Sequence, residues 1–422
     1  MEFIPSFDEQ KKINDIYKIY AGQYSLLRLT PTMVIKNNID ANGSLRFLVE
    51  ANGLINYADM QPGGANGVTL PAVLLSCDET MPVNIKFYMV TNARGDRRFS
   101  IERIKNKVQE QVFSIDDMLY FGVHRQPNGE KQLFLLDLSR NFPSDRLLGE
   151  YFGKDADQLA VALEQLKPRL AAVIHGGPYK NKKGVGAIKP KDAGDTFEWV
   201  MGLETNNDRG ADYHGLIEYK TKRSETRNTL FTVRPHFDGT PVAEYEPNDR
   251  NRVSAMQRLY GYESDKHPGQ KSLYVTIGDE LRPANHHGFF LAVDYDAKRV
   301  NLMHKEKEGG KEKSVVVAYW PMAELKDALA KKHPSTLWIV AVTVKQGSET
   351  EIAEFKFTHV SYTRTPQFST FLSMIERGVV TYDWRGYTTP YGAYQGKNHG
   401  NAWRINPKYT SELFGVAKEL EL

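Results

Sequence analysis

The stretch Gly194–Lys222 of this 422-residue chain reads G-D-T-F-E-W-V-M-G-L-E-T-N-N-D-R-G-A-D-Y-H-G-L-I-E-Y-K-T-K. Near its end, one residue separates Glu218 from Lys220. Successive side chains of a strand point to opposite faces, so a strand here places Glu218 and Lys220 on one face and Tyr219 on the other. A bend in the preceding segment brings Asp212 toward Glu218, and two carboxylates that approach closely resist joint ionisation unless a cation lies between them.

This spacing predicts a Mg²⁺ site held by Asp212 and Glu218. A bound Mg²⁺ would polarise a phosphoryl oxygen and lower the pKa of a bound water molecule. Lys220 would assist the attacking nucleophile and stabilise the charge that develops in the transition state. The competing interpretation is a solvated sheet edge, because carboxylates and lysines are common on half-exposed strands.

Glu198 precedes Asp212 inside a predicted helix from Thr196 to Leu203. The pattern Asp195-Thr-Phe-Glu198 is typical of a capping box, in which the glutamate side chain returns to the N–H of Asp195. A glutamate in the first helical turn can also face a metal ion or order its water. Glu198 is therefore a further candidate catalytic residue.

The order of a helical glutamate, an aspartate and Glu-x-Lys on a strand resembles the PD-(D/E)XK nucleases, and more narrowly the MvaI/BcnI restriction endonucleases of the MutH-like branch. The motifs that carry this resemblance run in order from residue 194 to residue 406: G-x-T-F-E (194–198), A-D-Y-H (211–214), I-E-Y-K-T (217–221), T-L-F-T (229–232), Y-W (319–320), I-E-R-G (375–378), D-W-R (383–385) and G-A-Y…H-G-N-A-W-R-I-N (392–406). Two departures from the family pattern are one extra residue between Asp212 and Glu218, and an insertion at Gly386–Tyr391.

The resemblance implies a type II restriction endonuclease that hydrolyses double-stranded DNA at a short CCWGG- or CCSGG-type site with Mg²⁺ as its cofactor. It implies a monomer that works beside a cognate DNA methyltransferase. The implied catalytic residues are Glu198, Asp212, Glu218 and Lys220, with Asp212 and Glu218 as metal ligands.

The family also implies a group of DNA-contacting positions near the C-terminal end. Arginine and histidine donors can meet the N7 and O6 acceptors of guanine. For Arg404, which alternates with Trp403 and Ile405, the alternative is a solvent-facing strand residue. The matching positions are Arg385, Lys397, Asn398, His399 and Arg404.

Residues 1–148 contain short apolar or alternating runs separated by Gly, Pro and Asn clusters, which predicts an all-β domain. The predicted strands are Tyr24–Leu29, Leu45–Val49, Val83–Val90, Phe99–Ile104, Met118–Val123 and Lys131–Leu138. An all-β module in front of a MvaI-like nuclease resembles the UbaLAI architecture, whose first domain is a B3-like pseudobarrel that binds DNA as an effector domain. The segment N-A-R-G-D-R-R carries Arg94, Arg97 and Arg98, which form either a soluble hairpin tip or a basic finger that reaches into a DNA groove.

Residues 149–422 are expected to form the catalytic α/β domain, so the predicted fold class is mixed α+β. The lysine-rich segment Tyr179–Lys191 is interpreted as a flexible loop or a segment that tracks DNA phosphates. The apolar run Leu337–Val344 predicts a central strand. Phe289–Asp294 and Val300–His304 predict a hairpin, and Pro321 predicts a helix start.

Composition sets broad limits on the class of protein. The length fits two domains, and 41% hydrophobic with 25% charged residues is typical of a soluble globular protein. A net charge of +3 neither requires nor excludes a nucleic-acid partner. The single Cys77 excludes a disulfide within the chain and a cysteine-rich zinc site. Without a signal-like N-terminus or a membrane-spanning apolar run, we expect a cytoplasmic protein with no membrane partner.

Two other functions compete with an autonomous restriction enzyme. One is a MutH-like repair nicking endonuclease that a partner recruits, and the other is a catalytically inactive DNA-binding protein. Double-strand cutting at a fixed sequence by the purified chain excludes the first, whereas binding without scission supports the second. If the N-terminal domain binds a second copy of the site, we expect it to stimulate cleavage.

Overall fold

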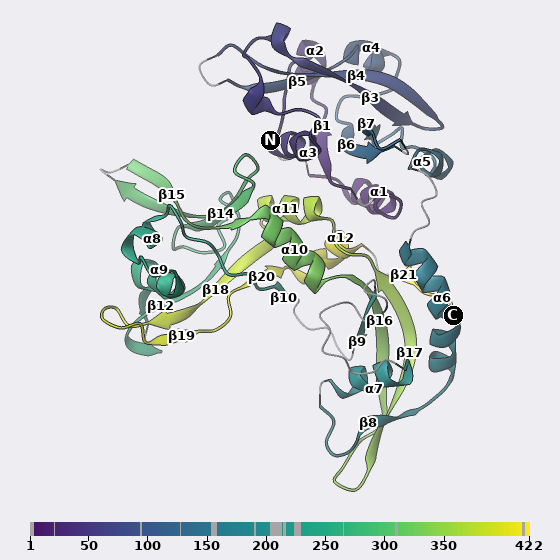
Figure 1. Ribbon diagram of the computed structural model, residues 1–422, viewed down its shortest axis with the longest axis vertical. Coiled ribbons are helices and arrows are strands. Elements are labelled where there is room, and N and C mark those ends of the chain that lie inside the picture. The colour runs from purple at the N-terminus through teal and green to yellow at the C-terminus, as the bar shows by residue number, and fades with distance from the viewer. Residues whose placement is uncertain are drawn as a thin grey trace.

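The computed structural model describes residues 4–422 except 21, 93–94, 127, 153–157, 190, 203–212, 214–216, 223–228, 265, 309–310 and 416–417. Figure 1 shows an N-terminal part above two C-terminal arms that extend in different directions. This is a mixed α+β fold, as the sequence predicts. Among the described residues, no helix is both long and apolar enough to cross a bilayer.

The N-terminal part is built on a seven-stranded sheet in the order β1-β6-β7-β3-β4-β5-β2. Neighbouring strands are antiparallel except for the parallel pair β3 and β7. The predicted strands near residues 24–29, 83–90, 99–104, 118–123 and 131–138 are confirmed. The strands are β1 (Tyr24–Arg28), β2 (Ile39–Asp40), β3 (Val68–Ser76), β4 (Glu79–Met89), β5 (Arg97–Ile101), β6 (Met118–Arg125) and β7 (Lys131–Asp137).

This part is not all-β, which corrects the prediction. Helix α3 (Gly43–Ala51) occupies the predicted strand Leu45–Val49. The side chain of Asn42 accepts a hydrogen bond from the N–H of Leu45 at 2.8 Å and so caps the helix. Buried residues at helical spacing then face the sheet, and a short apolar run alone does not distinguish this from a strand. The other helices are α1 (Phe7–Tyr17), α2 (Pro31–Lys36), η1 (Tyr57–Asp59), η2 (Gly64–Asn66), α4 (Ile104–Gln109) and α5 (Asp145–Phe152).

The first C-terminal arm combines two sheets around one core. A six-stranded sheet has the order β10-β20-β18-β12-β11 with β19 paired to β18, and a three-stranded sheet has the order β13-β14-β15. The fully buried rings of Trp320 and Trp403 meet at a centroid distance of 5.0 Å. The predicted hairpin is confirmed by β13 and β14, and the predicted helix start by Pro321, which precedes α10.

The strands of this arm are β10 (Thr229–Phe231), β11 (Tyr262–Ser264), β12 (His267–Ile277), β13 (Phe289–Asp294), β14 (Arg299–Glu308), β15 (Lys311–Pro321), β18 (Val380–Thr388), β19 (Gly396–Asn398) and β20 (Ala402–Ile405). Its helices are α8 (Pro241–Tyr245), η3 (Asp249–Asn251), α9 (Arg252–Tyr260), α10 (Met322–Lys332), α11 (Phe368–Glu376), η4 (Pro407–Tyr409) and α12 (Thr410–Phe414).

The second arm is a five-stranded sheet in the order β21-β17-β16-β9, with β8 paired to β17. Strand β16 lies between β17 and β9, which confirms the predicted central strand. Half of the lysine-rich segment forms β8, so it is not simply a loop; its Tyr179 pairs with Phe355. The elements are α6 (Gln158–His175), β8 (Tyr179–Val185), α7 (Asp192–Val200), β9 (Ile217–Lys222), β16 (Ser335–Lys345), β17 (Ile352–Thr363) and β21 (Lys418–Glu419).

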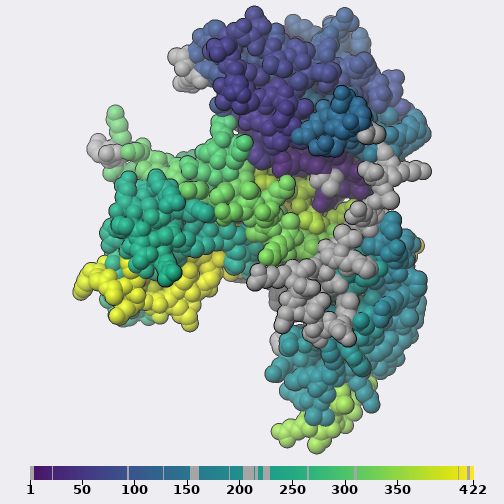
Figure 2. Space-filling model, in the orientation of Figure 1, coloured from purple at the N-terminus to yellow at the C-terminus, as the bar shows by residue number. Residues whose placement is uncertain are grey.

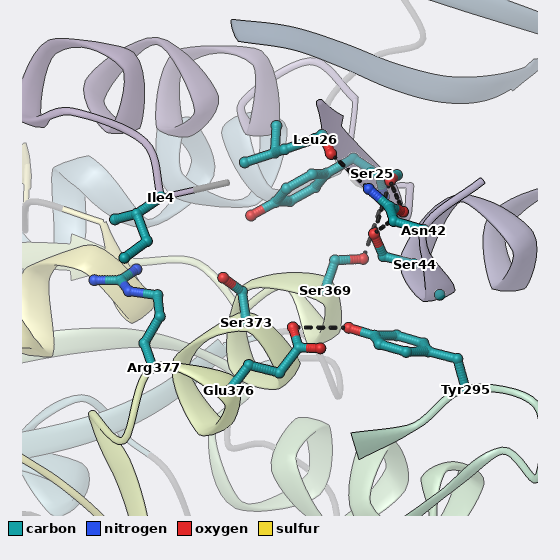
Figure 3. Close-up of a pocket in the computed structure, with 12 residues that line it drawn as sticks. Ile4, Ser25, Leu26, Asn42, Ser44, Tyr295, Ser369, Ser373, Glu376 and Arg377 are labelled. Carbon is teal, nitrogen blue, oxygen red and sulfur yellow. Dashed lines mark hydrogen bonds between the residues drawn. The ribbon is translucent and has the colours of Figure 1, made fainter. Parts of the chain in front are cut away.

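The N-terminal part contacts the first arm through polar groups and a pair of rings. The hydroxyls of Tyr24 and Thr370 are 2.7 Å apart, and the N–H of Tyr24 donates to Ser369 at 3.2 Å. The ring centroids of Phe47 and Tyr295 are 6.2 Å apart. Figure 3 shows the pocket of about 290 Å³ at this contact, lined by serines from both parts. In the space-filling view, the outline of the molecule is indented between the two arms (Figure 2).

Candidate active site and nucleic-acid interface

Strand β9 places the predicted Glu-x-Lys pair at the edge of the five-stranded sheet. It runs parallel to β16, with Glu218 paired to Thr336 and Lys220 paired to Trp338. Tyr219 is only 6% exposed and faces the apolar core beneath α7. Glu218 and Lys220 are half-buried and lie on the opposite face, so the predicted alternation of side chains holds.

The ammonium of Lys220 lies near an indole ring and a neutral histidine. Its Nζ is 5.8 Å from the centroid of the Trp338 ring. Burial lowers the pKa of His333 to about 4, and the positive charge of Lys220 contributes to this shift. Nε2 of His333 lies 2.7 Å from the carbonyl oxygen of Leu230, so the neutral ring donates its N–H there. His333 thus adds no second positive charge beside Lys220 near neutral pH, and the sequence did not single it out.

Helix α7 carries Glu198 and covers the other face of β9. The ring of Phe197 meets that of Tyr219 at a centroid distance of 5.6 Å, which fixes the helix against the strand. Glu198 is half-buried in the last turns of this helix. Asp212, the other predicted metal ligand, lies outside the described residues.

The predicted capping box at Asp195 is wrong. Helix α7 starts at Asp192, and the N–H of Asp195 already donates to the carbonyl of Lys191 at 3.0 Å. The buried carboxylate of Asp192 accepts hydrogen bonds from the N–H of Lys189 at 2.9 Å and from Asn181 at 3.0 Å. The helix therefore begins four residues before its predicted start at Thr196.

Mg²⁺ prefers oxygen ligands, and the carboxylate of Glu218 is a donor of this kind. Within the described part of the chain, no group of three or more His, Cys, Asp or Glu side chains could hold a metal ion. The donor chemistry of Glu218 fits a divalent cation when a second carboxylate, predicted to be that of Asp212, completes the pair.

On the outward face of the six-stranded sheet, two arginine side chains contact the same buried aspartate. Asp383 is 2% exposed and accepts hydrogen bonds from Thr276 at 2.7 Å and from Arg385 at 2.8 and 3.1 Å. Arg404 forms an ion pair with the same carboxylate. Burial alone would raise the pKa of Asp383, but these hydrogen bonds and charges lower it. One ionised side chain therefore positions both Arg385 and Arg404.

Histidine and polar side chains extend this face along β19. The N–H of His399 donates to the carbonyl of Arg385 at 2.9 Å, and its ring lies near those of Tyr274 and Tyr387. Lys397 and Asn398 are exposed on β19. The structure thus brings Arg385, His399 and Arg404 to one face, opposite the buried Trp403, with Lys397 and Asn398 beside them.

The predicted arginines of the N-terminal hairpin are engaged within the protein. Arg97 pairs with Asp296 of the first arm at 2.7 Å, and Arg98 pairs with Asp40 at 2.9 Å. Arg94 lies outside the described residues. The hairpin therefore contacts the C-terminal part of the chain in this structure.

Strand β9, with Glu218 and Lys220, and the sheet face that carries Arg385 both lie in a region that matches a known nuclease family. The model of the MvaI/BcnI restriction endonuclease family matches residues 169–414, which is more than half of the chain. The protein is thus a site-specific DNA nuclease of the type II restriction class. It belongs to the MvaI/BcnI restriction endonuclease family.

Two solved structures are similar to this chain. One is the restriction endonuclease MvaI in complex with its cognate DNA substrate, at 22% identity and a TM-score of 0.39, covering 61% of this chain and 97% of that chain. The other is MvaI in the absence of DNA, also at 22% identity and a TM-score of 0.39, covering 62% and 98%. A comparison with curated proteins finds no match.

Proposed function

We propose that the protein is a PD-(D/E)XK endonuclease that cleaves double-stranded DNA at a short CCWGG- or CCSGG-type site with Mg²⁺ as cofactor. The observation that carries this proposal is the position of Glu218 and Lys220 on one face of the edge strand β9. Both side chains are half-buried and therefore partly accessible on this face. The family match over the same residues supports it.

In this proposal Glu218 and Asp212 hold the metal ion, and restriction endonucleases generally use divalent metal ions. When bound, the ion supplies Lewis-acid activation of the scissile phosphate. Lys220 orients the attacking water and stabilises the negative charge of the transition state. Glu198 would order water around the ion. Because the ring of His333 is neutral, it adds no second positive charge beside Lys220.

In this proposal, the outward face of the six-stranded sheet recognises the DNA bases. Arg385 and Arg404 would donate to guanine acceptors in the major groove, and a good bidentate pair contributes about 1–3 kcal/mol of discrimination. His399 would contact a neighbouring base. Lys397 and Asn398 would contact the backbone or a base edge from β19.

The N-terminal residues 1–148 act in this proposal as a B3-like effector domain in front of the catalytic residues 149–422. Arg94, Arg97 and Arg98 would contact a second copy of the site and stimulate cleavage. The enzyme would act as a monomer beside a cognate DNA methyltransferase that protects the host sites.

Incubation of the purified protein with plasmid and Mg²⁺ tests the proposal. We expect linear DNA with fixed ends, and Lys220→Ala should slow cleavage by roughly a hundredfold or more because it removes transition-state stabilisation. Gel shifts in Ca²⁺ should show that this variant still binds DNA. Lys345→Ala, which changes a lysine of β16 that pairs with Glu351, is the matched control and should cleave normally.

Three results would contradict the proposal. Nicked circles without linear product would instead indicate a recruited nicking enzyme. Binding without scission in Mg²⁺ or Mn²⁺ would indicate an inactive DNA-binding protein. Full activity of Lys220→Ala would remove the site on β9 from the reaction.

A further inference from the structure

The outward face of the six-stranded sheet continues from β18 to the edge strand β11. Tyr387 of β18 pairs with Lys397 of β19 and with Ser272 of β12. Ser272 in turn pairs with Tyr262 of β11. Ladder partners lie on the same face of a sheet, and Arg385 lies on this face two residues before Tyr387. Helix α9 packs against the opposite face of these strands (Figure 1). One surface therefore carries both Arg385 and Tyr262.

Aromatic rings cover this surface across the strands. The ring centroids of Tyr274 and Tyr387 lie 5.9 and 6.0 Å from that of His399. Burial raises the pKa of Tyr274, and the neighbouring Tyr387 and Tyr262 contribute to this shift. Ser272, which lies between Tyr387 and Tyr262 in the ladder, is fully buried. The rings thus form one layer that extends from His399 to Tyr262.

A pair of histidines extends this layer beyond the edge strand. The ring of His287 stacks on that of Tyr262 at a centroid distance of 5.0 Å and an interplanar angle of 13°. The exposed ring of His286 lies 4.1 Å from that of His287. The side chain of Asn285 holds this loop, because it accepts a hydrogen bond from the N–H of His287 at 3.0 Å and donates to the carbonyl of Phe289 at 2.9 Å. The histidine pair therefore lies at the β11 end of the outward face.

The charge of the outward face favours a polyanion. Arg385, Arg404 and Lys397 lie on it. Among the described outward-facing residues of β11, β12, β18, β19 and β20, Asp383 is the one acid, and two arginines already pair with it. Glu263 follows Tyr262 on β11 and so points to the opposite face. Nucleic-acid phosphates are the polyanion that such a surface fits.

The position of the histidine pair indicates which part of a duplex it would meet. Strand β11 lies two strands away from β18, which is about 10 Å, and the pair lies beyond β11. A major groove is about 12 Å wide. With Arg385 at a base edge, the pair would lie outside the bases being read, where phosphate oxygens are the main acceptors.

Other titratable groups surround the histidine pair. Tyr262 faces it from β11. On β14, His304 lies 3.5 Å from Glu306, and Lys305 pairs with Glu280 at 3.3 Å. These two acids are thus engaged with groups of β14.

The neighbours of His287 oppose its protonation in the free protein. Burial lowers the pKa of His287, and His286 and His304 contribute to this shift because a nearby positive charge disfavours a second one. A phosphate beside the pair has the opposite effect, since its negative charge favours the protonated ring. DNA binding would then be coupled to proton uptake, and affinity would rise as the pH falls through the range in which histidine titrates.

We propose that His286 and His287 contact a phosphate of the bound duplex outside the bases that Arg385 and His399 read, and that the pair takes up a proton when it does so. A phosphate contact of this kind adds affinity for every DNA sequence alike. The inference rests on the proposed function, because it assumes that the outward face of the six-stranded sheet binds DNA.

Affinity measured at pH 6 and pH 8 tests this assignment. The probes are a duplex with a CCWGG site and an unrelated duplex of the same length, both bound in Ca²⁺. Glutamine keeps a polar side chain but takes up no proton. The double variant His286→Gln/His287→Gln should bind both duplexes roughly tenfold more weakly than wild type at pH 6, and almost as tightly at pH 8. Its salt dependence at pH 6 should fall by about one phosphate contact.

Two single variants complete this test. His286→Gln changes an exposed ring and should show part of the same effect, so the test does not depend on the folding of the double variant. His175→Gln, which changes an exposed histidine at the end of α6, is the matched control and should bind as wild type does at both pH values.

Two further measurements identify the proton and the phosphate directly. Calorimetry at pH 7 in buffers of different ionisation enthalpy should show net proton uptake by wild type on binding, and less uptake by the double variant. Neutral methylphosphonates placed one at a time along the duplex should reveal a position that weakens wild type and leaves the double variant unchanged.

The outcomes separate this inference from the proposed function. If wild type binds DNA and the double variant has the same affinity and proton uptake, the histidine contact is overturned and the function stands. If the pH dependence is instead lost in His399→Gln, it belongs to the base-reading residue and the inference is also overturned. If wild type binds neither duplex, the proposed function itself fails.

Discussion

At the scale of single residues, Asp383 is the position on which the proposed DNA-reading face depends. Its carboxylate is buried, yet its pKa is lowered because Thr276 and Arg385 donate to it and Arg404 pairs with it. A buried carboxylate stays ionised only when such partners compensate for lost hydration. The same bonds hold two flexible arginine side chains in defined positions, so less conformational entropy is lost when they bind a base.

We predict that Asp383→Asn reduces the preference of the enzyme for its own site. The amide keeps the size of the side chain but no longer attracts both guanidinium groups, so Arg385 and Arg404 should lose their common orientation. The ratio of specific to nonspecific affinity should fall roughly tenfold, in line with about 1–3 kcal/mol per base contact.

Competition binding with cognate and unrelated duplexes measures this ratio. Asp238→Asn is the control, because Asp238 is exposed and also pairs with an arginine, Arg252. An unchanged ratio in Asp383→Asn, with a normal thermal unfolding temperature, would show that the arginines do not depend on this acid.

At the scale of elements, α1 shows how a helix is fixed to the N-terminal sheet by one buried glutamate. Glu9 closes a capping box with Ser6 and is 5% exposed. It accepts hydrogen bonds from Arg28 of β1 at 2.8 Å and from Ser139 at 2.6 Å. Burial would raise the pKa of Glu9, but these hydrogen bonds and the charge of Arg28 lower it to about 2.

We predict that Glu9 makes the N-terminal part acid-sensitive. Its pKa in the folded state, about 2, lies below the ordinary value of 4.5, so its stabilisation is complete above pH 4.5 and is lost as the pH falls toward 2. Glu9→Gln should lower the free energy of unfolding at pH 7 by about 1–3 kcal/mol and should flatten its decrease below pH 4.5.

Urea unfolding at pH 7, 4.5 and 3 checks this prediction. Asp8→Asn alters an exposed acid in the same helical turn and should leave the pH dependence unchanged. A Glu9→Gln variant with the same acid sensitivity as wild type would assign the effect to another group.

At the scale of the whole molecule, exposed ion pairs form part of the contact between the N-terminal part and the first arm. Asp296, in the turn between β13 and β14, pairs with both Arg46 at 3.1 Å and Arg97 at 2.7 Å. Its side chain is 50% exposed, and ion pairs of this kind contribute little to stability. Arg97 is also one of the predicted DNA-contacting residues, so in the proposed function a phosphate would compete with Asp296 for this side chain.

We predict that Asp296→Asn strengthens binding of a second duplex to the N-terminal part of the full-length protein. The affinity should rise severalfold at low salt, because Arg46 and Arg97 are released, and the difference should shrink at high salt as the charges are screened. Unfolding should change by less than about 1 kcal/mol.

Titration of the enzyme, already saturated with one cognate duplex, with a labelled second duplex measures this affinity. Asp327→Asn changes an exposed acid of α10 and serves as the control. Equal affinities of Asp296→Asn and wild type at low salt would show that the paired arginines do not bind DNA.

The sequence by itself determined the elements whose signals are local. The alternation of side chains predicted that Glu218 and Lys220 share a face of a strand, and a long apolar run predicted the central strand β16. Both signals come from consecutive residues, so one segment of sequence is enough to show them. Ordered motifs predicted the nuclease family. Local signals failed where two structures share one pattern, as at α3, where a short apolar run fits both a helix and a strand.

Only the tertiary structure decided which distant residues act on one another. Asp383 and Arg404 come from different strands, His333 reaches the neighbourhood of Lys220 from the end of α10, and Arg258 of α9 donates to the carbonyl of Thr389 just after β18. These contacts arise from strand order and helix packing, which depend on the burial of the whole core. They therefore cannot be predicted from the residue pattern of any one segment.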